Sequence, residues 1–333
     1  MDQLQELLRE IEALSFKEKM QLTTRLLETY LKELPEQTGT DADPWNDGLD
    51  RALDQFKRSI EKGAASSDKI AEGFSNLDDL TGGLFKGTLT VVGGRPATGK
   101  TTFLLNLARR LMQNGASIGF VSLGQNLERL ARGMLQLYSG GPAHRSKIIK
   151  STANKLEALE NSWSLLKAQP FYPFYFDDIY TDIGKVLEVC RLAVTDRGAQ
   201  VIMIDYLQLI GTSNDPTLRR DVQSRVVIKE LKRFARQYEV AVVVTSSLGR
   251  EADLRAGAKE PLMSDLVGSD MIEELADDVL LIYRPYYYGI IEDTDGRDTR
   301  NFTSLIVAKN KAGQSRDVHF RFNSKNLEWV PLK

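Results

Sequence analysis

Cysteine, histidine and long apolar runs are scarce in this chain, and each scarcity excludes a class of protein. One cysteine among 333 residues excludes a disulfide framework and any metal site built on cysteines. The two histidines argue against a histidine-based zinc site. No run approaches the roughly 20 apolar residues of a membrane span, and the first residues do not resemble a signal peptide. We therefore expect a cytoplasmic protein without membrane partners.

The chain also lacks a clear excess of basic or acidic residues. The 44 basic and 46 acidic residues leave a formal net charge of −2, so the chain as a whole does not attract nucleic acid. A surface that binds nucleic acid must then be local, such as a loop or the lumen of a ring. The length allows one large α/β domain and a smaller appendage.

The first part of the chain predicts helices and a linker rather than a large domain. Residues 1–35 fit a helical hairpin, which packs either on a partner chain or on the main domain. Residues 36–69 fit a linker with an amphipathic helix at about 47–62. Four apolar residues recur in it at helical spacing, as expected of a helix that docks on a neighbouring subunit: Leu49, Leu53, Phe56 and Ile60.

Residues 70–333 alternate between strand and helix patterns, which predicts an α/β fold with a mainly parallel central sheet. The expected strands are 89–92, 117–123, 171–176, 201–204, 240–245, 279–283, 305–308 and 318–322. The last two strands are expected to form a β-hairpin at the C-terminal end. The expected helices are 102–113, 126–138, about 152–168, 183–196 and 219–238.

The stretch from Gly94 to Thr101 fits the phosphate-binding pattern G-x-x-x-x-G-K-[ST]. An apolar β-branched run precedes it and a helical pattern follows it, which is the strand–loop–helix context of a P-loop. Lys100 is expected to reach the β- and γ-phosphates of ATP, and the Thr101 hydroxyl to ligate Mg²⁺. The expected nucleotide-binding residues are Gly94, Arg95, Pro96, Ala97, Thr98, Gly99, Lys100, Thr101 and Thr102.

A second element of the nucleotide site is predicted at Asp205. Residues 201–204 form an apolar strand pattern, and Asp205 follows it as in a Walker B element. By itself an apolar run that ends in aspartate is as well explained by an ordinary buried strand. Its place about a hundred residues after the P-loop favours a carboxylate that holds the Mg²⁺ hydration shell opposite Thr101.

Residues 94–103 and 204–209 together resemble the DnaB-type replicative helicases. Further matches in the expected order extend the resemblance over residues 70 to 325: Thr81–Leu84, Ser122–Leu123, Ser264–Leu266, Ile272–Glu273, Ala276–Asp277 and Ile282–Arg284. The resemblance implies a RecA-like P-loop ATPase core that assembles as a hexameric ring around single-stranded DNA and works with other replication proteins. The short N-terminal hairpin differs from the family's larger collar domain.

Three positions depart from the family in residues that the resemblance assigns to hydrolysis. Gly124 stands where the family has a glutamate that polarises water, and Ser247 where it has a glutamine. Lys311 replaces the arginine that reaches a neighbour's γ-phosphate, keeping the charge but not the planar guanidinium. Since hydrolysis at a P-loop needs such groups, the pattern favours ATP binding over fast turnover.

The resemblance also places two loops toward the channel of a ring. Expected DNA-contacting cations in and after these loops are Arg219, Arg220, Arg250, Arg255 and Lys259. Such cations bind phosphates without reading base sequence, although ordinary solvated arginines and lysines explain them equally well.

Two hypotheses of different classes follow. The first is a DnaB-like, ATP- and Mg²⁺-dependent DNA helicase or translocase core, acting in replication or on mobile-element DNA, in which Lys100, Asp205 and Lys311 serve catalysis. The second is an ATP-binding assembly or regulatory protein on the same core with little hydrolysis. A RecA-like recombination or clock-type ATPase fits the P-loop but not residues 206–209.

Overall fold

The computed structural model describes residues 69–71, 73–139, 153–178, 180–212, 220–255, 257–293, 296–311 and 315–332. The predicted hairpin at 1–35 and the predicted docking helix at 47–62 lie outside the described residues, as does Arg219. Among the described residues, no helix combines the length and the apolar character needed to cross a bilayer.

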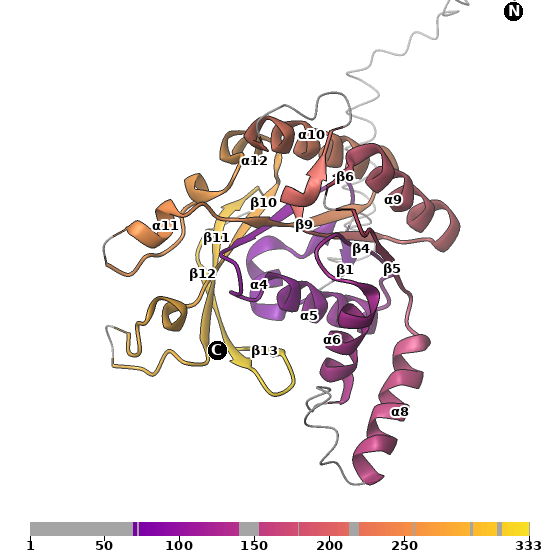
Figure 1. Ribbon diagram of the computed structural model, residues 1–333, viewed down its shortest axis with the longest axis horizontal. Helices are drawn as coiled ribbons and strands as arrows, with labels where there is room; N and C mark the ends of the chain where they lie inside the picture. The colour runs from indigo at the N-terminus through magenta and orange to yellow at the C-terminus, as the bar shows by residue number, and fades with distance from the viewer. Residues whose placement is uncertain are drawn as a thin grey trace, which may run out of the picture. The chain divides into compact units, whose positions relative to one another are not determined.

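A nine-stranded sheet organises the described part of the chain (Figure 1). Six neighbouring strands are parallel, in the order β10 (Asp278–Tyr283), β3 (Leu89–Gly94), β9 (Ala241–Ser247), β7 (Val201–Asp205), β4 (Ile118–Ser122) and β5 (Phe171–Tyr175). Three antiparallel strands extend the β10 edge: β11 (Phe302–Asn310), β12 (Asp317–Asn323) and β13 (Glu328–Pro331). The predicted α/β fold with a mainly parallel sheet and a C-terminal β-hairpin is confirmed.

Helices cover both faces of this sheet (Figure 1). One face carries α4 (Ser75–Thr81), α5 (Lys100–Gln113) and α6 (Leu127–Ser139), and α8 (Ala153–Lys167) packs against α6. The other face carries α9 (Ile183–Arg197), α10 (Arg220–Tyr238) and α12 (Ser269–Leu275). Because both faces are covered, the residues of β3, β4 and β7 are all buried, and most of them are apolar.

Several short elements had no sequence signal strong enough to predict them. They include the β1–β2 pair (Lys69–Ala71 and Leu84–Phe85) and the β6–β8 pair (Thr181–Asp182 and Ile210–Gly211). The sheet's last strand, β13, also escaped prediction, although its Trp329 is buried against Phe103 of α5. Strands of two to four residues carry too few alternations for a periodicity to be read.

The parallel strands bring their carboxyl ends to one edge of the sheet, and this places the site. Gly94 ends β3, Ser247 ends β9 and Asp205 ends β7, so segments far apart in sequence leave neighbouring strands together. Ligands of open α/β sheets bind at this edge.

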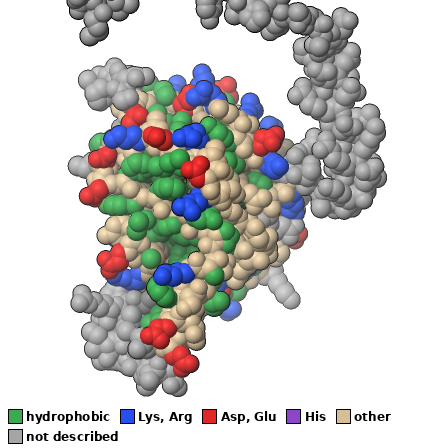
Figure 2. All heavy atoms as spheres, turned by 90° about the vertical axis from the view of Figure 1, so that its right-hand side faces the viewer, with side chains coloured by type: hydrophobic (Ala, Val, Ile, Leu, Met, Phe, Trp, Pro, Cys, Tyr) green, Lys and Arg blue, Asp and Glu red, His purple; other side chains and the backbone are tan. Residues whose placement is uncertain are grey.

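On the face shown in Figure 2, acidic and basic side chains are interspersed, in line with the near-zero net charge.

Candidate nucleotide-binding site

The loop between β3 and α5 has the backbone of a phosphate-binding turn. Its residues 95–99 pass from the sheet edge into the first turn of α5, so that helix N–H groups face the loop's interior. Gly99 has a φ of 105°, a conformation that side chains rarely allow. A Cβ on Gly94 would lie 2.7 Å from the Thr98 hydroxyl oxygen, so the turn is too tight for a side chain there.

Lys100 lies inside this loop. Its Nζ donates to the carbonyl oxygens of Gly94, at 2.8 Å, and of Arg95, at 3.2 Å. Burial lowers the pKa of Lys100 to about 8; Asp205 opposes this shift, and the charge of Arg95 adds to it. The ammonium is therefore held in a partly desolvated position, where a phosphate group would be a strong partner.

Asp205 and Thr101 meet directly, although 104 residues separate them in sequence. The Thr101 hydroxyl donates to the Asp205 carboxylate at 2.5 Å, and the Thr245 hydroxyl donates to the other carboxylate oxygen at 2.6 Å. Asp205 is buried. This pair of oxygen ligands beside a lysine is the donor chemistry that Mg²⁺ takes when it is bound together with a substrate phosphate.

These groups line a cavity of about 450 Å³. Its wall comprises Pro96, Ala97, Gly99, Lys100, Thr101, Thr102, Gly124, Gln125, Arg129, Asp205, Tyr206 and Ser247. The structure thus brings the predicted Lys100, Thr101 and Asp205 together with the altered positions Gly124 and Ser247. A second cavity of about 600 Å³, which shares Thr101, Thr102, Gln125 and Arg129 with the first, adds room for the rest of a nucleotide.

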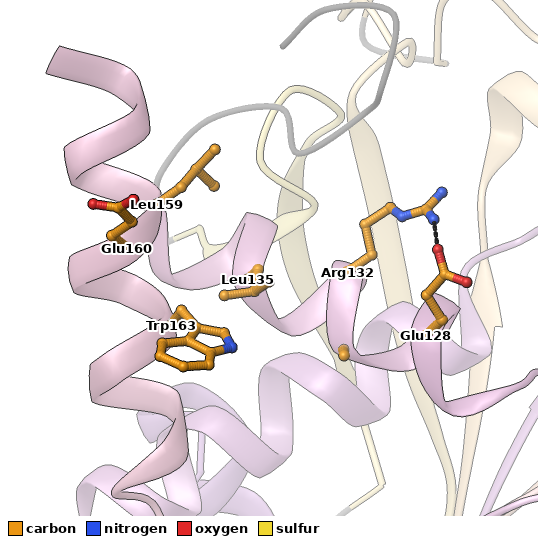
Figure 3. A pocket seen from close by; sticks show the side chains of 7 residues that line it. Glu128, Arg132, Leu135, Leu159, Glu160 and Trp163 are labelled. Carbon is orange, nitrogen blue, oxygen red and sulfur yellow. Dashed lines mark hydrogen bonds and ion pairs between the residues drawn. The ribbon is translucent and has the colours of Figure 1, made fainter. Parts of the chain in front are cut away.

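Asp205 is the one carboxylate in the lining of the 450 Å³ cavity. Glu128, one helical turn beyond Gly124, is exposed and forms an ion pair with Arg132 at 2.5 Å (Figure 3). It lines both the 600 Å³ cavity beside the nucleotide site and a neighbouring groove, which includes Leu135 and Trp163 (Figure 3). The 450 Å³ cavity therefore holds one carboxylate, that of Asp205, and the carboxylate of Glu128 belongs to the adjoining cavity, where Arg132 binds it.

Arg129 is a cavity residue that sequence reasoning missed. It lies in the first turn of α6, after β4, and its exposed side chain contributes to both cavities. The available signal was its position, because the first turn of a helix that follows a parallel strand lies at the ligand-binding edge.

Gln208 braces the ends of β7 and β9. Its side chain donates to the Ser246 hydroxyl at 2.8 Å and accepts from the Ser247 backbone N–H at 2.9 Å. Ser247 is thereby fixed at the cavity wall. The family-like sequence around Gln208 thus has a structural function in this chain.

Lys311 lies at the opposite edge of the sheet. Its backbone N–H donates to the Asp277 carbonyl and its Nζ lies 3.4 Å from the Asp277 carboxylate, which also accepts from the N–H of Leu89. Leu89 begins β3 and Gly94 ends it, so about 17 Å of strand separate this edge from the P-loop. Lys311 cannot reach the cavity of its own chain.

The predicted DNA-contacting cations differ in their surroundings. Arg250 is exposed at the start of α11 (Glu251–Leu254). Arg255 donates to the Asp265 carboxylate at 2.7 Å and to the Glu260 carbonyl at 2.6 Å, so it holds its own loop together. Lys259 lies 6.0 Å from the ring centroid of Tyr288. Arg220 begins α10.

Comparison with known proteins agrees with this geometry. The chain is 30% identical over 258 residues to a "Probable plasmid replicative DNA helicase" of Chlamydia psittaci, covering 77% of this chain and 54% of that protein. It is 30% identical over 266 residues to the "Replicative DNA helicase DnaB" of Geobacillus stearothermophilus, covering 79% and 57%. The chain thus spans little more than half the length of these relatives.

Two solved structures share the fold. One, an isolated ATPase domain, superposes with a TM-score of 0.73 at 24% identity, covering 86% of this chain and 99% of that one. The other, a DnaB-like replicative helicase studied with primase, gives a TM-score of 0.73 at 22% identity, covering 99% and 75%. The family model of the DnaB-like helicase C-terminal domain matches residues 69–330, and the chain belongs to that family.

Proposed function

We propose that this chain is the ATP-binding motor core of a DnaB-like helicase or translocase, which acts on single-stranded DNA in replication or mobile-element maintenance. The observation that carries the proposal is that Lys100, Thr101 and Asp205 line one cavity in a chain that belongs to this family. The name of the Chlamydia psittaci relative, a plasmid replicative helicase, supports the mobile-element setting.

Each group has a defined task in this proposal. Lys100 neutralises the β- and γ-phosphates of ATP, and Thr101 with Asp205 holds Mg²⁺, which supplies charge neutralisation at the phosphates when bound. Arg250 and Lys259 contact DNA phosphates without reading sequence. The protein works in the cytoplasm and associates with other replication proteins, as one structural relative, a DnaB-like helicase, interacts with primase.

A ring of identical subunits completes the site. Lys311 lies about a strand length from its own P-loop, so its charge can serve hydrolysis only at a neighbouring subunit. A closed ring gives every cavity one such neighbour. A homohexamer, as the family resemblance implies, is the assembly we propose.

Hydrolysis in this copy is slow. Asp205 is the one carboxylate in the lining of the 450 Å³ cavity, and Glu128 of the adjoining cavity is paired with Arg132, so no free carboxylate acts as a base for the attacking water. The second candidate function follows from the same observation: an ATP-binding assembly or regulatory protein, which uses nucleotide to set its oligomeric state and hydrolyses little.

Steady-state ATP hydrolysis with and without single-stranded DNA separates the two functions, with Lys100→Ala as the blank. DNA-stimulated turnover well above the blank supports the motor. Tight ATP binding with turnover at the blank level supports the assembly protein. Failure of the wild-type chain to bind ATP would refute both.

A further inference from the structure

The P-loop arginine Arg95 turns away from the cavity and binds the neighbouring loop. Its Nε lies 3.0 Å and its Nη2 2.5 Å from the two carboxylate oxygens of Asp253, and its Nη1 donates to the Leu248 carbonyl at 2.8 Å. The guanidinium thereby makes a two-pronged ion pair and one further charged hydrogen bond. Only 12% of the Arg95 side chain is exposed, against 34% for Asp253. Such planar, partly desolvated pairs are stronger and more directional than surface ion pairs.

Sheet topology explains why the two segments meet. β3 and β9 are adjacent and parallel, and Gly94 pairs with Ser247 at their carboxyl ends. The P-loop and the segment 248–266, which we call the β9 loop, therefore leave the sheet side by side. The Leu248 N–H also lies 3.4 Å from the Gly94 carbonyl, which places the start of the β9 loop directly against the phosphate-binding turn.

The β9 loop is tied into one unit. Leu248 and Leu266 form an antiparallel bridge at its base, and the Gly249 N–H donates to the Asp265 carbonyl at 2.7 Å. Inside the loop Arg255 pairs with Asp265, and from β10 the Tyr283 hydroxyl donates to the Ala258 carbonyl. Asp253 and the exposed Arg250 share one turn of this loop, because the Asp253 N–H donates to the Arg250 carbonyl at 2.9 Å.

The backbone of Arg95 is tied to the phosphate-binding lysine. Its carbonyl accepts from Lys100 Nζ at 3.2 Å and from the Thr98 hydroxyl at 2.7 Å. A phosphate between Lys100 and the helix N-terminus competes for the same ammonium, so nucleotide binding changes the hydrogen bonds that hold the Arg95 peptide. Arg95 is thus fixed at one end by the nucleotide site and at the other by the β9 loop.

We propose that Asp253 is a positioning residue that acts through Arg95, so that nucleotide binding at the P-loop orders the β9 loop. The inference rests on the proposed function, because it needs a nucleotide at Lys100, and it adds the route by which that nucleotide reaches a predicted DNA-contacting loop. Ser247, where the family resemblance places a glutamine, has a short side chain at the cavity wall. The Arg95–Asp253 ion pair connects the P-loop to the β9 loop.

Hydrogen–deuterium exchange of the full chain tests this link. Amide exchange in residues 249–262 is measured with and without the non-hydrolysable analogue AMP-PNP and Mg²⁺, at saturation determined by a fluorescent nucleotide titration. In the wild type, we expect nucleotide to slow exchange in the loop about 5-fold or more, the lower end of typical coupling between sites. Asp253→Asn keeps Lys100, Thr101 and Asp205, so it is expected to bind AMP-PNP but to lose the protection of the loop.

Two further variants distinguish a positioning role of Asp253 from a general loosening of the β9 loop. Tyr283→Phe removes another hydrogen bond that holds the same loop and leaves Arg95 unchanged. Amide exchange in the loop is therefore expected to be faster in this variant, while the ratio of the exchange rates without and with AMP-PNP stays as in the wild type. Asp253→Glu retains the carboxylate and is expected to restore the response. A merely structural role of Asp253 would make Tyr283→Phe lose the response as well.

Each outcome decides the proposal. Asp253→Asn with wild-type protection, or a wild-type loop that does not respond although AMP-PNP is bound, overturns it. Loss of the response in Asp253→Asn, together with its retention in Tyr283→Phe and return in Asp253→Glu, supports it. A wild-type chain that binds no AMP-PNP refutes the proposed function itself, which is a different result from an unresponsive loop.

Discussion

Restoring a carboxylate at position 124 is the most direct test of why this site should hydrolyse slowly. Gly124 lies in the wall of the cavity that contains Lys100 and Asp205, and its backbone is not in the left-handed region. A Cβ there would lie 3.1 Å and 3.4 Å from two ring carbons of Tyr206 and 3.8 Å from Leu209. The ring must give by a few tenths of an ångström, so Gly124→Glu is expected to fold with a side chain that enters the cavity.

The size of the gain follows from the rest of the site. A single preorganised polar group at a reacting centre is worth about 10²- to 10³-fold in rate. Ser247 and Lys311 remain unchanged in this variant, and the contact with Tyr206 limits how well the new carboxylate is aimed. We therefore expect an increase in the ATP hydrolysis rate of about 10- to 100-fold, which corresponds to roughly 1.4 to 2.7 kcal/mol of activation free energy.

The assay is single-turnover hydrolysis of radiolabelled ATP at saturating enzyme, which removes effects of affinity. Gly124→Gln supplies a side chain of the same size without a base, and Gly124→Ala reports what contact with Tyr206 does alone. The ATP hydrolysis rate of Gly124→Glu should exceed the rates of both control variants by about 10- to 100-fold. If Gly124→Glu binds ATP normally and is no faster than Gly124→Gln, the reasoning is refuted, because another group then orients the water or the geometry cannot use a carboxylate.

Three further perturbations test the site and its support. Raising the pH from 7.5 to 9 neutralises Lys100, whose pKa is lowered to about 8, so a fluorescent nucleotide titration should show about 8-fold weaker ATP binding; a flat profile would contradict the assignment. Asn106→Ala removes a buried side chain that accepts from the backbone N–H of Trp329, and urea unfolding should report a loss of about 2 to 4 kcal/mol, whereas a loss below about 0.5 kcal/mol would exclude this bracing role. Lys232→Met leaves the buried Asp277 carboxylate without its main partner and should destabilise by about 3 kcal/mol, with part of the loss recovered by adding Asp277→Asn.

The fold was predictable because its signals are local. The eight predicted strands and five predicted helices of residues 70–333 are all present, since β-branched runs and helical spacing are properties of short stretches. The P-loop was predictable for the same reason, because a phosphate-binding turn is built from consecutive residues between Gly94 and Thr101. The four-residue strand β13 was not predicted, because it is defined by its pairing with β12 and is too short to show a periodicity of its own.

The candidate site was predictable only in part. Lys100, Thr101 and Asp205 were expected together, and the structure places them in one cavity. Arg129 was not expected, because an arginine in an amphipathic helix looks like any solvated side chain. The helical hairpin at 1–35 and the docking helix at 47–62 stay predictions.

What the sequence determined by itself is the identity of the groups that bind phosphate and metal, because a motif fixes both residue type and spacing along the chain. What only the tertiary structure decided is which distant groups share a space. The strand order β3–β9–β7 sets Asp205 against Thr101 and joins Arg95 to Asp253 across 158 residues. Strand order depends on how the helices cover both faces of the sheet, and no local stretch of sequence encodes that packing.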